Sequence, residues 1–202
     1  MPTASFETRW ATERVPSWLE LALEAMPTHA PAILSMGSVL YQQGRVDEGR
    51  QLFESLLSLP KNTTDICQII DEAVFLTKVG ALQDGMALYR AAVKRYPDVS
   101  ALFEGLGYCA GQAGLHREAV SAHERALELE PDNQRLVNGL GWTLLQAGHI
   151  LEARKTLERA VSMDPSDRLA QENLRFCERQ AARTNLGADG NSQTRRAPRP
   201  FP

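Results

Sequence analysis

Two short stretches of this sequence, residues 101–108 and 135–142, decide the fold. They read ALFEGLGY and RLVNGLGW, and each residue of the second lies 34 positions after its counterpart in the first. The same interval separates the small residues and prolines that follow: Gly114 and Gly148, Ala119 and Ala153, Ala126 and Ala160, Pro131 and Pro165. A fixed period of about 34 residues predicts a stack of helix-turn-helix units, each of which buries its apolar face against the next.

The pattern continues toward the N-terminus and predicts four units, at 30–63, 64–97, 98–131 and 132–165. In the first of them, Ile33, Met36, Gly37 and Leu40 have the i, i+3, i+4, i+7 spacing of one helix face. Second helices are expected over 46–59 and 82–95. The interval from Gly44 to Gly80 is 36 residues, so the join between the first two units carries two extra residues.

The two ends of the chain depart from the repeat. Residues 1–29 are interpreted as a worn N-terminal repeat, with helices near 5–13 and 16–25. Residues 166–184 are predicted to form a capping helix, because Ala170, Leu174, Cys177 and Ala181 make one narrow apolar stripe among polar residues. Residues 185–202 have little to bury and are expected to be disordered. Asp98, Asp132 and Ser166 are expected to cap the helices that follow them.

These positions resemble the tetratricopeptide repeat family, whose pattern wants LeuGly, an aromatic residue, and then Gly, Ala, Ala and Pro at set intervals. Leu106, Gly107, Gly114, Ala119 and Pro131 match it in one copy. The resemblance covers about residues 30–183. It implies an all-α fold, a right-handed superhelix (α-solenoid) of stacked helix-turn-helix repeats with a C-terminal capping helix. In that fold, the first helices of successive units line a concave groove that docks peptides or proteins.

An aromatic column marks the face that the resemblance places in this groove. Tyr108, Trp142 and Phe176 are 34 residues apart, and helical geometry turns Tyr108 away from the buried stripe of its helix. Aromatic anchors are frequent in binding surfaces, although such rings also serve only to cover helix surface. Arg179 is expected among the polar residues of the same groove. The predicted peptide-binding residues are Cys67, Ile70, Asp71, Val74, Lys78, Glu104, Tyr108, Gln112, Arg135, Asn138, Trp142, Gln146, Glu172 and Phe176.

The function that we expect is a non-enzymatic adaptor or scaffold that holds a segment of another protein. One alternative is a dedicated chaperone, because residues 40–53, LYQQGRVDEGRQLF, resemble the first repeat of bacterial type III translocator chaperones. Another is a self-associating structural scaffold. A clamp for a chaperone's C-terminal carboxylate is disfavoured, because Glu104 and Glu172 would repel that group.

Composition excludes several other classes. The net charge of the 202 residues is only -3, without a long run of one sign, so no nucleic-acid partner is expected. No stretch resembles a signal peptide or a membrane span, which favours a cytoplasmic protein. No catalytic triad or phosphate-binding loop is present, and we expect no catalytic residue and no cofactor. No metal site is expected either, because the cysteines lack CxxC spacing and His116, His123 and His149 do not share a face.

Overall fold

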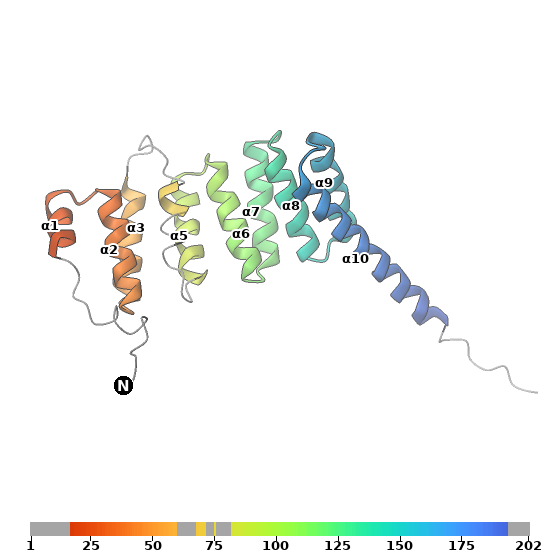
Figure 1. The fold of residues 1–202 in the computed structure, drawn as a ribbon, viewed down its shortest axis with the longest axis horizontal. Coiled ribbons are helices and arrows are strands. Elements are labelled where there is room, and N and C mark those ends of the chain that lie inside the picture. The colour runs from red at the N-terminus through yellow and green to blue at the C-terminus, as the bar shows by residue number, and fades with distance from the viewer. Residues whose placement is uncertain (1–16, 60–67, 72–74, 76–81, 194–202) are drawn as a thin grey trace, which may run out of the picture. The chain divides into compact units, whose positions relative to one another are not determined.

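The computed structural model describes residues 17–59, 68–71, 75 and 82–193, and over these residues it contains helices and turns but no strand (Figure 1). The all-α repeat fold is therefore confirmed. The predicted helix near 5–13 lies outside the described residues, as do Cys67, Val74 and Lys78. The chain divides into two compact units, residues 1–114 and 115–202, which are described separately below.

The first unit contains a helical hairpin and two further helices that pack as a pair. Its elements are α1 (Ser17–Ala25), α2 (Ala30–Gln42), α3 (Val46–Ser55), a 3-10 turn η3 (Leu56–Ser58), α5 (Leu82–Arg95) and α6 (Ser100–Gln112). Gly44 follows α2 with a φ of 74°, a left-handed conformation that glycine adopts without strain. The predicted helix over 46–59 ends as the η3 turn, in which the Leu59 N–H donates to the Leu56 carbonyl over 3.1 Å.

Polar contacts join α3 and η3 to α5. Arg50 Nε donates to Asp84 Oδ1 over 2.8 Å, and these two residues are one repeat length apart in the sequence. The Tyr96 hydroxyl donates to the carbonyl of Leu59 over 3.0 Å, and its ring is fully buried. Burial, with the Asp84 carboxylate as a second cause, raises the pKa of Tyr41 to about 12. These contacts hold α3 and η3 against α5 across the join that carries the extra residues.

The second unit consists of four helices: α7 (His116–Leu129), α8 (Gln134–Gln146), α9 (Ile150–Met163) and α10 (Arg168–Gln193). Helices α8, α9 and α10 lie side by side (Figure 1). Their shared core contains Leu140, Leu144, Leu157 and Cys177, all nearly inaccessible to solvent. The stripe predicted for the capping helix therefore does face the last repeat.

Two details at the helix ends differ from the sequence expectations. The N-caps lie one residue later than predicted: Asn133 Oδ1 accepts from the Arg135 N–H over 3.1 Å, and Asp167 Oδ1 accepts from the Leu169 N–H over 2.8 Å. The N-cap of α6 is Val99, which forms no side-chain cap. Helix α10 also continues to Gln193, past the boundary expected at residue 184. No proline interrupts the chain between 184 and 193, so the backbone is able to keep its helical hydrogen bonds.

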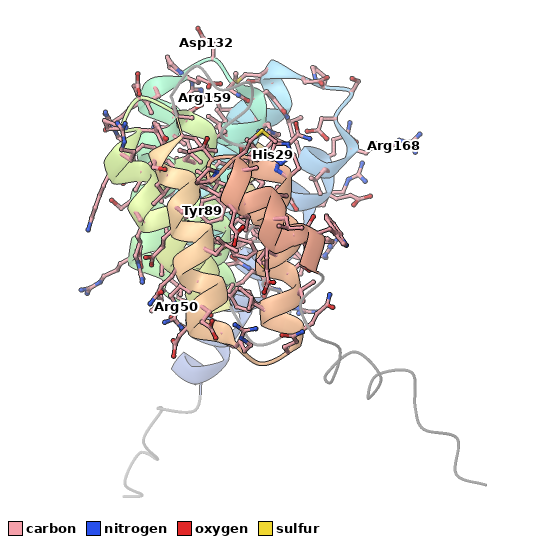
Figure 2. All side chains as sticks on the ribbon, turned by 90° about the vertical axis from the view of Figure 1, so that its left-hand side faces the viewer. His29, Arg50, Tyr89, Asp132, Arg159 and Arg168 are labelled. Atoms are coloured by element: carbon pink, nitrogen blue, oxygen red, sulfur yellow. The ribbon has the colours of Figure 1, made fainter. Side chains whose placement is uncertain are left out.

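Glycines on α6 and α8 make room for large side chains of the preceding helices. A Cβ atom at Gly105 would lie 2.4 Å from the ring of Tyr89 on α5. Gly139 occupies the same place one repeat later, and a Cβ atom there would lie 3.2 Å from the ring of His123 on α7. The Tyr89 hydroxyl donates to Asp71 Oδ1 over 2.6 Å, which fixes the ring (Tyr89 is labelled in Figure 2). Close helix packing therefore requires glycine more strictly at position 105 than at 139.

We expect Gly105→Ala to reduce the free energy of unfolding by about 1–3 kcal/mol, because the new methyl group must displace the hydrogen-bonded Tyr89 ring. Gly139→Ala is the matched comparison, since its methyl group meets His123 at a longer distance and alanine favours a helix by about 0.5–1 kcal/mol. Urea unfolding followed by circular dichroism measures both variants. Equal losses of stability would contradict this account of the packing.

Candidate partner-binding site

An aromatic pair lies on the surface between α8 and α10. The ring centroids of Trp142 and Phe176 are 5.7 Å apart and the ring planes are inclined by 51°, a tilted arrangement that aromatic pairs favour. Trp142 is half-buried, and Phe176 keeps 37% of its side-chain surface exposed. The pair packs from outside on the core of the unit, because Trp142 contacts the cluster around Leu140 and Leu157.

The two rings lie in a shallow hollow of about 350 Å³. Its lining residues are Trp142, Glu172, Asn173, Arg175, Phe176 and Arg179. The guanidinium of Arg179 lies 5.8 Å from the centroid of the Phe176 ring, within the range of a cation–π contact. Asn173 Nδ2 donates to Asn138 Oδ1 over 3.0 Å, which ties α10 to α8 at the base of the hollow. The hollow therefore has an aromatic floor and a mostly polar, cationic rim. We call it the α8–α10 hollow.

Most of the predicted binding residues that the structure describes reach solvent. Tyr108, which lies on α6 in the first unit, is 66% exposed. Glu104 and Trp142 are partly buried, and the remaining exposed members are Asp71, Gln112, Arg135, Gln146, Glu172 and Phe176. The structure brings Trp142, Glu172 and Phe176 together around one hollow.

Two of the predicted residues do not line an open surface. Ile70 is completely buried and Asn138 is 6% exposed, so the prediction of both as groove-lining side chains is wrong. Asn138 faces α10 because the capping helix covers that side of α8, and its amide is used in the bond to Asn173. Asp71 is exposed but accepts the Tyr89 hydroxyl, which gives it a structural role.

Sequence reasoning missed Asn173 and Arg175, which also line the hollow. Their counterparts 34 residues earlier are Gly139 and Gly141, which lie against side chains of neighbouring helices, so the repeat pattern gave no reason to expect Asn173 and Arg175 at a surface hollow. A usable signal was available for Asn173, because it lies three residues before Phe176 and shares its helix surface.

The described cysteines and histidines show no reactive or metal-binding arrangement. Cys109 and Cys177 are buried free thiols, and burial raises the pKa of each. His123 is buried, with Nδ1 3.0 Å from the Ala119 carbonyl and 3.3 Å from Thr143 Oγ1. Within the described ranges, no three His, Cys, Asp or Glu side chains are grouped so that they would hold a metal ion. No helix in these ranges has the length and apolar character needed to cross a membrane.

The fold and the hollow define a helical-repeat protein with an exposed aromatic surface patch. Two profiles described as tetratricopeptide repeat match residues 78–134 and 110–175. Residues 78–175 are therefore tetratricopeptide repeats, as the sequence resemblance implies. No curated protein matches it.

Solved structures support the same fold at low sequence identity. The protein MamA is 18% identical, with a TM-score of 0.51 over 73% of this chain and 79% of MamA. YrrB, titled a TPR protein with an unusual peptide-binding site, is 16% identical with a TM-score of 0.54 over 81% and 84% of the two chains. The first TPR domain of human RPAP3 is 17% identical with a TM-score of 0.55 over 60% and 97%. Likeness at this level establishes the architecture only.

Burial lowers the pKa of His123 below its ordinary value of 6.5. As pH falls, the unfolded chain therefore takes up a proton before the folded one does. The contribution of neutral His123 to the free energy of unfolding is therefore fully present above about pH 6.5. It is lost as pH falls below that value, by at most about 1.4 kcal/mol per pH unit. We expect His123→Leu, which copies Leu157 of the next repeat, to flatten this dependence. Melting temperatures between about pH 5 and pH 7 measure it. Identical pH dependence in both proteins would exclude His123 as the cause.

Proposed function

We propose that this protein is a non-enzymatic adaptor that holds a segment of a partner protein at the α8–α10 hollow. The observation that carries the proposal is the partly exposed Trp142–Phe176 pair in a surface hollow. Large aromatic side chains in such positions are frequent anchors of protein interfaces, because they bury much area at a small cost in conformational entropy. The size of the hollow suits one large apolar side chain of the partner.

The comparisons support a binding role of this general kind. One similar structure, the first TPR of Spaghetti (RPAP3), is described as bound to the HSP90 peptide SRMEEVD; it is 18% identical with a TM-score of 0.52 over 57% of this chain. Tyr108 on the first unit remains a predicted second anchor. The chaperone alternative rests on the resemblance of residues 40–53 and on the expected N-terminal helical extension, and it stays a prediction.

A second candidate, self-association, is favoured by one observation on α1. Trp18 and Leu21 are 62% and 63% exposed, one turn apart on the helix that begins the described chain. Exposed apolar residues grouped in this way are a common basis of contacts between copies of a protein.

The adaptor proposal is tested with Phe176→Ala, because this ring is the more exposed of the pair. Proteins captured from lysate by the wild-type chain are identified by mass spectrometry, and the affinity of a captured partner is then measured by titration. We expect Phe176→Ala to weaken it at least tenfold, a loss of about 1.4 kcal/mol. Leu151→Ala is the control, because Leu151 on α9 is 84% exposed and lies outside the hollow. Unchanged affinity of Phe176→Ala, with an unchanged circular dichroism spectrum, would rule out the hollow.

The self-association candidate predicts that the mass from light scattering rises with concentration. The double variant Trp18→Ser with Leu21→Ser should remain a monomer, because it removes the exposed apolar pair. A wild-type mass that stays monomeric at every concentration would eliminate this candidate.

A further inference from the structure

Helix α10 presents a row of arginines to solvent. Arg168, Arg175, Arg179 and Arg183 fall within about 80° of one another around the helix at 100° per residue. All four are exposed, and Arg168 projects away from the helices in Figure 2. We call these four residues the arginine face. Two of them, Arg175 and Arg179, also line the α8–α10 hollow, so the row and the aromatic pair form one continuous surface.

Several other arginines among the described residues are paired with carboxylates, whereas the members of the arginine face are not. Arg50, Arg125 and Arg154 bind Asp84, Glu128 and Glu158 at 2.8–2.9 Å. Among the described residues, no ion pair joins a member of the arginine face to an acidic side chain. Arg175 donates instead to the amide oxygen of Gln171 over 3.4 Å, and Arg179 lies over the Phe176 ring. The charges on this surface are therefore available to an external anion.

Helix α8, which lines the hollow together with α10, adds no negative charge. Helix α8 contains one charged residue, Arg135, and no acidic residue. On α10, Glu172 is the one acidic side chain that lines the hollow, and Glu178 turns to another side of the helix, where it affects the buried Cys177. This surface is thus cationic on a chain whose net charge is -3. A cationic patch on a protein of negative net charge attracts a short acidic segment that fits within the patch. A long polyanion is attracted less, because the rest of the protein surface repels it.

We propose that the arginine face and the α8–α10 hollow together bind an acidic peptide segment that carries one large apolar side chain. This inference rests on the proposed adaptor function and specifies its partner. From Arg168 to Arg183 the helix rises about 22 Å. An extended chain covers this length in about seven residues at about 3.3 Å each. Carboxylates of the segment pair with the guanidinium groups, which present two parallel N–H donors to a carboxylate. The apolar side chain enters the hollow beside Phe176.

The test uses the full chain and capped, fluorescent nine-residue peptides in which Glu and Asp surround one central Phe. A peptide with Gln and Asn at the acidic positions is the neutral counterpart. We expect the acidic peptide to bind at least tenfold more tightly at low salt, and this preference to shrink as ionic strength rises, because exposed charges are screened. Fluorescence anisotropy measures both affinities. Vesicles containing phosphatidylserine and an oligo(dT) strand are titrated as competing anions.

Charge variants locate the binding surface. Arg175→Gln with Arg179→Gln should weaken the acidic peptide at least tenfold and leave the neutral peptide within about twofold. Glu172→Gln is the opposite control on the same face, and it should strengthen the acidic peptide. Arg154→Gln on α9 removes an arginine outside the face and should change neither affinity. Circular dichroism confirms that each variant is folded.

Each outcome decides between the two proposals. Equal affinity for the acidic and neutral peptides, with both lost in Phe176→Ala, would overturn the acidic preference and leave the adaptor function standing. A captured partner whose affinity falls in Phe176→Ala but not in Arg175→Gln with Arg179→Gln would likewise overturn the acidic preference and leave the adaptor function standing. Tight binding of vesicles or oligo(dT) without binding of the acidic peptide would show that the surface recognises another class of anion. Failure of Phe176→Ala to affect a captured partner would count against the adaptor function itself.

Discussion

Close approach of neighbouring helices is the constraint on which the rest of this structure depends. A large side chain of one helix enters the space that a glycine leaves on the next, as Tyr89 does at Gly105 and His123 does at Gly139. Because every repeat leaves apolar surface that only its neighbour covers, each such contact stabilises two units at once. The repeats bury their small residues in these joins, whereas Tyr108 lies at the surface of its helix.

The last join differs from the others, and the candidate site arises there. Helix α10 covers α9 with Cys177 and Ala170, as a repeat helix would, and among the described residues Arg175 and Arg179 on its other side are exposed. Its polar residues therefore serve two roles. Asn173 is bound to Asn138 and holds the cap in place, whereas Arg175 and Arg179 stay at the surface around Phe176. The capping helix thus covers the last repeat and also supplies a charged rim for the aromatic pair.

Substitutions in the repeat pattern show how one position tolerates different chemistry. Phe53, Tyr89 and His123 occupy equivalent places on second helices. Tyr89 satisfies its hydroxyl with Asp71, and His123 satisfies Nδ1 with the Ala119 carbonyl and Thr143. Polar atoms at a buried position are retained where a partner is within reach, because an unpaired buried group costs about 1–3 kcal/mol. Among the described residues, every buried side-chain nitrogen or oxygen atom has a hydrogen-bond partner.

The sequence alone determined the period, the helix over 82–95 and the aromatic column, because these depend on local spacing along one chain. It placed Trp142 and Phe176 correctly at the surface, since helical geometry fixes which side chains face away from a buried stripe. The tertiary structure alone decided that Asn138 is covered, that the caps are Asn133 and Asp167, and that Arg175 reaches the hollow. These outcomes depend on how α10 crosses α8. A periodic pattern carries no information on that crossing, because the capping helix is not itself a copy of the repeat.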